Sequence, residues 1–584
     1  MDAVTGPTAR VARVNGPLVE VTGLAGVAMY DIVELGEHLL PGEAVAIRGD
    51  VTTVQAYEYT GGLAPGHPAW TRGEPLSARL GPQLLGGIFD GLLRPLSGAP
   101  AWLEPGHPFA LATAREFEFT PLVAAGAVVR EGASLGSVTV PGGIDYRVLV
   151  PPGLSGVAEK VREAGPSPAD AVIATVSGTD VCLTSAWPVR RPRPYRQRLD
   201  ADAPLLTGQR VIDVLFPVVK GGSCAVPGGF GTGKTVLLQQ ITKWCDADVI
   251  VYVGCGERGN ELADMLAELA ELSDPRTGGK LAARTVVIAN TSNMPMMARE
   301  ASIYSGACVA EHFRDMGLDV VVVADSTSRW AEALREFASR TGELPAEEGY
   351  PASLSSALAA FYERAGRVVT SDGREGSVTI IGAVSPAGGD MTEPVTAYTQ
   401  RFVRSLWSLD RDLAYARHYP ALSWSGSFSR DIDTFAAWHA GAGDRAWGAR
   451  RSRLAALLAE ADRLASLAEL MGVAALPPRE RATILAGRLI REGLLQQSAI
   501  SSVDASCDIG RAAALADAML AVAERCQQLA DSPVPPAALE GLDFSPIVRA
   551  REEAATPDAV ADREQIMLAR LDQLLRSSTE GMTP

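Results

Sequence analysis

An eight-residue glycine-rich run constrains the fold of this 584-residue chain more than any other feature of its sequence. The run consists of Gly228, Gly229, Phe230, Gly231, Thr232, Gly233, Lys234 and Thr235, and it matches the pattern G-x-x-x-x-G-K-[ST]. An apolar stretch at 223–226 precedes it, and a helical pattern begins at Lys234. Because glycines let the backbone turn its N–H groups onto phosphate oxygens, and a helix start adds positive potential, this strand–loop–helix unit predicts a nucleotide phosphate site.

Two side chains of the run have expected chemical roles. Lys234 is expected to reach the β- and γ-phosphates of a nucleotide, and the Thr235 hydroxyl is expected to bind Mg²⁺. The alternative is a chance match in a glycine-rich chain. Only five of the 53 basic residues are lysine, so the pattern is hard to obtain by composition alone.

Between about 195 and 435, apolar runs alternate with helical stretches. The valine- and isoleucine-rich runs lie at 223–226, 249–253, 285–289 and 320–324. Near-continuous apolar runs of this length are typical of strands buried on both faces. This part therefore predicts a parallel sheet covered by helices.

The remaining sequence divides into β-rich and helical parts. Short, closely spaced β segments in residues 1–72 predict a small barrel, and residues 73–110 are interpreted as a connecting segment. Residues 111–190 are again β-rich, and the run RRPRP at 190–194 is typical of a linker. Alanine, leucine and arginine at helical spacing predict a helical domain over 436–584.

Composition excludes several classes of protein. The net charge of −16 argues against a nucleic-acid binder. No run of 18 apolar residues predicts a membrane span, and the first residues do not resemble a secretory signal. The seven cysteines form no C-x-x-C pair, which fits a reducing compartment. We therefore expect a cytoplasmic protein.

An acidic residue ends the run at 320–324. Asp325 is expected to organise Mg²⁺, directly or through water. Because Ser326, Thr327 and Ser328 follow, a capping role for the next helix is the alternative. Many P-loop hydrolases carry a glutamate directly after this aspartate, whereas this chain has Ser326, so the base must lie elsewhere.

The end of the run at 249–253 supplies a candidate base. The sequence GCGERG at 254–259 matches a dinucleotide fingerprint formally, but Glu257 would bring a negative charge where a pyrophosphate should lie. We expect Glu257 to face a nucleophilic water, with Arg258 orienting it or meeting the phosphoryl charge. A solvated Glu–Arg pair in a loop is the alternative.

Several longer motifs resemble one protein family, the catalytic A subunit of V-type and A-type rotary ATPases. They are TGQRVIDVLFP at 207–217, ANTSNMP at 289–295, DSTSRWAEALRE at 325–336 and PAEEGYP at 345–351. The resemblance covers nearly the whole chain. It implies a multidomain α/β protein with an N-terminal β-barrel, an inserted bulge domain, a RecA-like P-loop domain and a C-terminal helical domain.

The resemblance also implies roles for individual residues. Phe230 would lie beside the phosphates, Glu257 would be the catalytic carboxylate with Arg258 as its neighbour, and Arg329 would lie near the γ-phosphate. Tyr419 resembles the aromatic residue that packs on adenine, although a core aromatic beside a proline turn is the alternative. Gln497 is a further candidate for the adenine pocket. One departure is Ile500, near which the family often has an aromatic side chain.

The family further implies an assembly. Three copies would alternate with three B subunits, which supply an arginine finger in trans, around a central shaft. Peripheral-stalk subunits and a membrane sector moving H⁺ or Na⁺ would complete it, so that the chain lies on the cytoplasmic membrane face. The alternatives are a nucleotide-binding subunit without hydrolysis and a related export or helicase-type ATPase.

Overall fold

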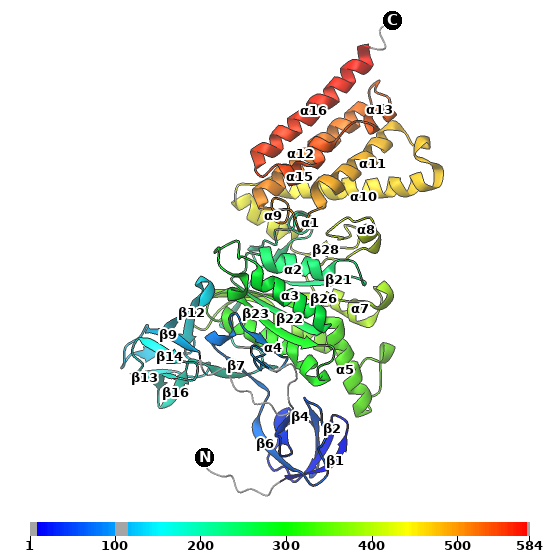
Figure 1. Cartoon of the computed structure of the whole chain (residues 1–584). Helices are drawn as coiled ribbons and strands as arrows, with labels where there is room; N and C mark the ends of the chain where they lie inside the picture. The colour runs from blue at the N-terminus through cyan, green and yellow to red at the C-terminus, as the bar shows by residue number, and fades with distance from the viewer. Residues whose placement is uncertain (1–8, 100–114, 581–584) are drawn as a thin grey trace.

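The computed structural model describes residues 9–99 and 115–580, arranged as four parts (Figure 1). A small barrel lies at one end, a sheet covered by helices lies in the middle, and a helical domain lies at the other end. A β-rich insert projects from the side of the central part. Residues 100–114, which contain the predicted boundary between connecting segment and insert, lie outside the described residues. The predicted multidomain α/β architecture is confirmed.

Six antiparallel strands close the N-terminal barrel. They are β1 (Ala9–Asn15), β2 (Leu18–Thr22), β3 (Asp31–Leu35), β4 (Leu40–Arg48), β5 (Val51–Ala56) and β6 (Pro68–Pro75). Alternating small apolar side chains such as Val19, Val21 and Val54 fill its interior. Strand β6, which pairs with β1 and β3, was not predicted, because it has proline at both ends and little apolar alternation.

Residues 73–99 do more than connect two domains. Strand β7 (Ser77–Leu80) pairs with β17 (Ser185–Pro188) of the returning chain. Strand β8 (Ile88–Phe89) joins the edge of the central sheet beside β23 (Thr285–Thr291). The interpretation as a connecting segment missed both pairings.

The insert consists of two four-stranded antiparallel sheets. One contains β10 (Val128–Val129), β13 (Gly156–Val161), β15 (Val172–Val176) and β16 (Thr179–Cys182). The other contains β12 (Asp145–Leu149), β11 (Ser134–Thr139), β9 (Glu116–Pro121) and β14 (Gly165–Pro168).

The RRPRP segment after the insert is held by ion pairs. Arg190 donates to both carboxylate oxygens of Glu300, at 2.8 and 2.6 Å, and contacts Glu43 of the barrel at 3.2 Å. Arg193 donates to Asp315 at 2.7 Å. The predicted linker therefore fastens the barrel and the insert to the central domain.

The central sheet is parallel except at its margins. Its main order is β28 (Phe428–Ser429), β27 (Ser405–Leu406), β21 (Ser223–Pro227), β26 (Glu375–Val384), β24 (Asp319–Asp325), β22 (Val249–Glu257), β23 and β8. Helices α2 (Lys234–Trp244), α3 (Gly259–Glu271), α4 (Met296–Arg314) and α5 (Thr327–Thr341) connect the strands and cover the sheet. The four predicted strands are confirmed, and their carboxyl ends meet at one edge, as parallel pairing requires.

Long helices form the C-terminal domain. They are α10 (Trp447–Met471), α11 (Pro478–Ile490), α12 (Ile509–Ala530) and α16 (Pro557–Glu580). In α10 the buried residues Leu454, Leu458, Ala461 and Leu464 recur every three or four positions, which explains why this segment packs as a helix. Within the described ranges, no helix combines the length and apolar character needed to cross a lipid bilayer.

Candidate active site

The glycine-rich run forms the loop between β21 and α2. Gly231 and Gly233 have φ angles of +80° and +81°, a conformation that side chains with a Cβ rarely adopt. Thr232 closes the loop, since its hydroxyl donates to the carbonyl oxygen of Gly229 at 2.8 Å. No side chain caps the start of α2, which begins at Lys234. The loop therefore presents a helix N-terminus of the kind that binds phosphate.

Lys234 lies across the loop from the end of strand β26. Its ammonium donates to the Ser385 hydroxyl and, at 3.3 Å, to the carbonyl oxygen of Val384. Ser385 is itself fixed by a 2.8 Å hydrogen bond from its backbone N–H to Ser328. Burial lowers the pKa of Lys234, and the charge of Asp325 opposes that shift. The lysine is therefore positioned to exchange these neutral partners for an anion.

Asp325 ends β24 at the same edge of the sheet. Its Oδ2 accepts a hydrogen bond from the Tyr252 hydroxyl at 3.2 Å, and the Thr235 hydroxyl also bonds to this carboxylate. Burial raises its pKa, while Lys234 lowers it. Among the described residues, its buried Oδ1 has no hydrogen-bond partner. A buried carboxylate oxygen beside a hydroxyl fits Mg²⁺, which prefers oxygen ligands and unmet acceptors of this kind.

Glu257 ends β22, the strand next to β24. A register irregularity between Cys255 and Glu257 separates the last residue from the regular ladder. Burial, and then the negative charge of Asp325, raise the pKa of Glu257 to about 7. Glu257, Lys234 and Asp325 line one cleft, with a volume of about 690 Å³. The carboxyl group thus lies on the phosphate-loop side of the sheet and not on a remote surface.

The two arginines singled out from the sequence have other partners in this structure. Arg258 lies 3.5 Å from the carboxylate of Glu261 and 5.8 Å from the centre of the Phe230 ring. Arg329 donates to both carboxylate oxygens of Glu332, each at 2.9 Å. Both arginines lie along the same cleft. The structure therefore places them near the phosphate loop without a direct bond to Glu257 among the described residues.

The sequence did not indicate three further residues of the cleft: Ser385, Arg299 and Arg411. Ser385 could have been found, because it directly follows the buried strand β26, whose end meets the other strand ends. Arg299 is on α4 and Arg411 begins α8 (Arg411–Tyr415). Neither arginine has a sequence signal, since both reach the cleft from elements distant in the chain.

A second pocket, of about 590 Å³, lies beside the loop. The ring of Tyr419 borders it and packs so closely on Gly233 that a Cβ there would lie 3.1 Å from the ring. Ile500 also lines the pocket and is 98% exposed. Gln497 is buried, and its amide is already engaged: Oε1 accepts from the backbone of Arg210 and Nε2 donates to the Gly208 carbonyl, both at 2.8 Å. Gln497 therefore forms the pocket wall.

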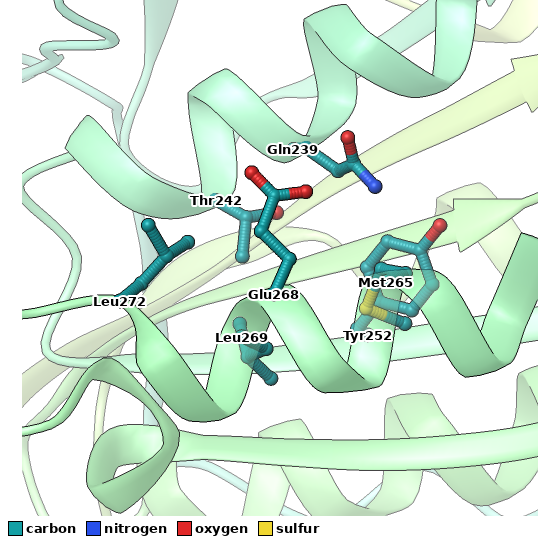
Figure 2. Close-up of a pocket in the computed structure, with 7 residues that line it drawn as sticks. All are labelled: Gln239, Thr242, Tyr252, Met265, Glu268, Leu269 and Leu272. Atoms are coloured by element: carbon teal, nitrogen blue, oxygen red, sulfur yellow. The ribbon is translucent and has the colours of Figure 1, made fainter.

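A third hollow lies between α2 and α3. Figure 2 shows Gln239 and Thr242 facing Glu268 and Leu269, with Tyr252 and Met265 beside them. Its volume of about 10 Å³ holds at most one water molecule. This hollow is a packing gap between two helices of the sheet's cover.

Comparisons with known proteins cover each of the four parts. The family models that match are "ATP synthase alpha/beta family, nucleotide-binding domain" at 208–429, "ATP synthase alpha/beta family, beta-barrel domain" at 11–69, "ATPsynthase alpha/beta subunit barrel-sandwich domain" at 109–190 and "C-terminal domain of V and A type ATP synthase" at 436–534.

Individual relatives match over most of their length. The "V-type ATP synthase alpha chain" of Anaeromyxobacter dehalogenans is 52% identical, over 86% of this chain and 88% of the relative. A relative from the A-type ATP synthase of Methanopyrus kandleri is 47% identical, over 90% and 91%. Among solved structures, the assembled ATPase EscN of the enteropathogenic E. coli type III secretion system has a TM-score of 0.62, covering 88% of this chain and 100% of EscN. At 21% identity, that likeness concerns the fold.

Proposed function

The chain belongs to the family of catalytic alpha, or A, subunits of V-type and A-type ATP synthases, and from this membership we propose that it binds ATP with Mg²⁺ and hydrolyses or synthesises it in the cleft described above. The observation that carries the proposal is the common cleft of Lys234, Asp325 and Glu257 with the phosphate loop.

Each residue has a distinct proposed task. The N–H groups of the loop and Lys234 hold the β- and γ-phosphates, and Lys234 leaves Ser385 to do so. Thr235 and the free Oδ1 of Asp325 hold Mg²⁺, which bridges phosphate oxygens and offsets their charge. Glu257 accepts a proton from the water that attacks the γ-phosphorus in line with the leaving oxygen.

Two arginines and two aromatic residues complete the proposed site. Arg329 and Arg258 meet phosphoryl charge by exchanging Glu332 and Glu261 for the nucleotide. Tyr419 packs on the adenine ring in the second pocket, with Gln497 forming its wall. Phe230 projects from the loop beside the phosphates, and 86% of its surface is exposed.

The exposed rim supports a site completed by a second subunit. Phe230 and Arg258 stack there in the open, where a partner would cover them. We assign this cover to the B subunit of an A₃B₃ ring, which supplies an arginine in trans. Shaft, stalk and membrane-sector subunits would convert turnover into H⁺ or Na⁺ transport, with this chain on the cytoplasmic face of the membrane and no nucleic-acid partner.

The test compares the full chain alone with the chain assembled with its B subunit. We expect phosphate release from MgATP to rise by about 100-fold or more on assembly, because an added arginine finger stabilises transition-state charge. Equal turnover by the isolated chain would instead indicate a self-sufficient export or helicase-type enzyme. ATP binding without turnover in the assembled ring would indicate a non-hydrolysing subunit.

A further inference from the structure

A buried carboxylate stands between the helical domain and the second pocket, which is called the base pocket from here on. We propose that Asp504 is a positioning residue: it holds the pocket wall, residues 496–500, against the central domain and ties that wall to the C-terminal helices. The inference rests on the proposed function, in which the base of the nucleotide lies against Tyr419.

Asp504 has no exposed side-chain surface and binds two arginines from different domains. Its Oδ1 lies 2.6 Å from Nη1 of Arg210, which begins α1 (Arg210–Leu215) of the central domain. Its Oδ2 accepts from Nη1 of Arg551 at 2.7 Å, in α15 (Ala550–Glu553). The same oxygen accepts from the backbone N–H of Ser498 at 2.7 Å. One carboxylate thus joins the central domain, the pocket wall and the helical domain.

Arg210 fixes the wall from the side of the central domain. Its guanidinium donates to the carbonyl oxygens of Leu494 at 2.7 Å and Gln496 at 2.6 Å. Its backbone N–H donates to Gln497, whose own N–H donates to the Tyr419 carbonyl at 2.8 Å. The wall and the aromatic residue of the pocket are therefore held by one continuous set of bonds that begins at Asp504.

Arg551 extends this network into the helices. Its carbonyl oxygen accepts from Arg511, in the first turn of α12. Arg511 also donates to Val503 at 2.7 Å and to Ala554, shortly before α16, at 2.8 Å. A shift of α12 or α16 would consequently displace the segment that carries Asp504, and with it the pocket wall.

The charges explain why the carboxylate matters more than its size. Asp504 neutralises two arginines that have little access to water, with 0% and 13% of their side-chain surfaces exposed. An asparagine would leave these two like charges close together and uncompensated. We expect the wall to move away from Arg210 or Arg551, which changes the base pocket but not the phosphate loop.

The test separates base binding from phosphate binding. The dissociation constants of MgATP and of magnesium tripolyphosphate, which has no base, are measured for the full chain and for Asp504→Asn. We expect MgATP to bind about tenfold more weakly and tripolyphosphate to change by less than about twofold. The control is Asp517→Asn, which removes a 2.8 Å partner of Arg450 in the helical domain, away from the pocket, and should change neither constant.

Three results would overturn the inference. The first is an equal loss for both ligands, which indicates general destabilisation, and the second is no loss for either. If Asp504→Asn does not fold, Arg551→Gln decides, with the same selective loss expected and Arg551→Lys retaining part of the affinity. The third is a wild-type chain that does not distinguish the two ligands, which would remove the proposed base pocket as well.

Hydrogen exchange gives a second readout that a locally structural role would not change. In the wild type, MgATP should slow amide exchange in segments 496–511 and 549–554 more than tripolyphosphate does, because the base engages the wall. In Asp504→Asn, that difference should disappear while protection of the phosphate loop remains. Unchanged protection of 549–554 by MgATP in the variant would contradict the link to the helices.

Discussion

The hydroxyl of Tyr252 donates to Oδ2 of Asp325 at 3.2 Å, across the neighbouring strands β22 and β24. Both side chains are buried at the edge of the sheet where the phosphate loop lies. The bond holds one carboxylate oxygen and leaves the buried Oδ1 without a hydrogen-bond partner among the described residues. Tyr252 therefore orients Asp325 as outer-shell groups orient metal ligands.

Removing this bond should weaken Mg²⁺ binding. Tyr252→Phe keeps the ring but frees the carboxylate, so the Mg²⁺ concentration for half-maximal ATP hydrolysis should rise by about tenfold. The control is Tyr146→Phe, which removes another buried hydroxyl, bonded to His312 in a distant part of the molecule. An unchanged Mg²⁺ requirement in Tyr252→Phe would contradict the assigned role of Asp325.

The rate should depend on the ionisation of Glu257, whose pKa is raised to about 7 by burial and by Asp325. Below that pH the carboxyl group carries a proton and cannot accept another, so kcat/KM should fall about tenfold per pH unit. Above it the profile should level off. Asp325→Asn removes the neighbouring negative charge and should shift the rising limb to lower pH, whatever its effect on the maximum. A limb in the same place in both proteins would rule out this coupling.

Lys234 should be needed to bind the triphosphate. Lys234→Ala removes the cation that is held at the loop by Ser385, and we expect MgATP to bind about 100-fold more weakly. Lys243→Ala is the matched control, because that lysine lies in the last turn of the same helix, over the Trp244 ring. Equilibrium binding of a fluorescent ATP analogue measures both. Similar affinities for the two variants would contradict the phosphate-loop assignment.

A buried ion pair should contribute strongly to the stability of the central domain. Arg364 donates to both oxygens of Glu311, at 2.8 and 2.6 Å, and at most 2% of either side chain is exposed. Arg364→Met leaves a buried carboxylate unpaired and should lower the free energy of unfolding by about 3 kcal/mol. Arg340→Met breaks an exposed pair with Glu336 and should cost less than about 1 kcal/mol. Thermal unfolding of both variants compares them, and equal melting temperatures would contradict this difference.

The phosphate side of the site could be located from sequence because of sheet geometry. Lys234, Glu257 and Asp325 each follow an apolar run, and parallel strands bring those ends to one edge. The base pocket could not be located in this way. Its wall at 496–500 lies far along the chain from the loop, and buried bonds to Arg210 hold it there, which no local pattern reveals.

Two features of the fold were missed for physical reasons as well. The arginines of the RRPRP segment suggest a solvated linker, yet Arg190 and Arg193 are neutralised by acids of α4 and the turn after it, which lie 110 and 122 residues later in the chain. Strand β26 begins with Glu375 and contains glycine and serine, which interrupt the apolar run although the strand lies in the middle of the sheet. Tertiary pairing decides both cases.

The most direct test of the proposed mechanism is single-turnover hydrolysis of MgATP by Glu257→Gln in the assembled complex. The amide keeps the size of the side chain but cannot accept the proton of the attacking water, so the hydrolysis rate should fall by about 10²- to 10⁴-fold while MgATP still binds. Glu261→Gln, which alters an exposed acid of the same cleft, should retain most of the rate. Hydrolysis by Glu257→Gln at the parental rate would contradict the account.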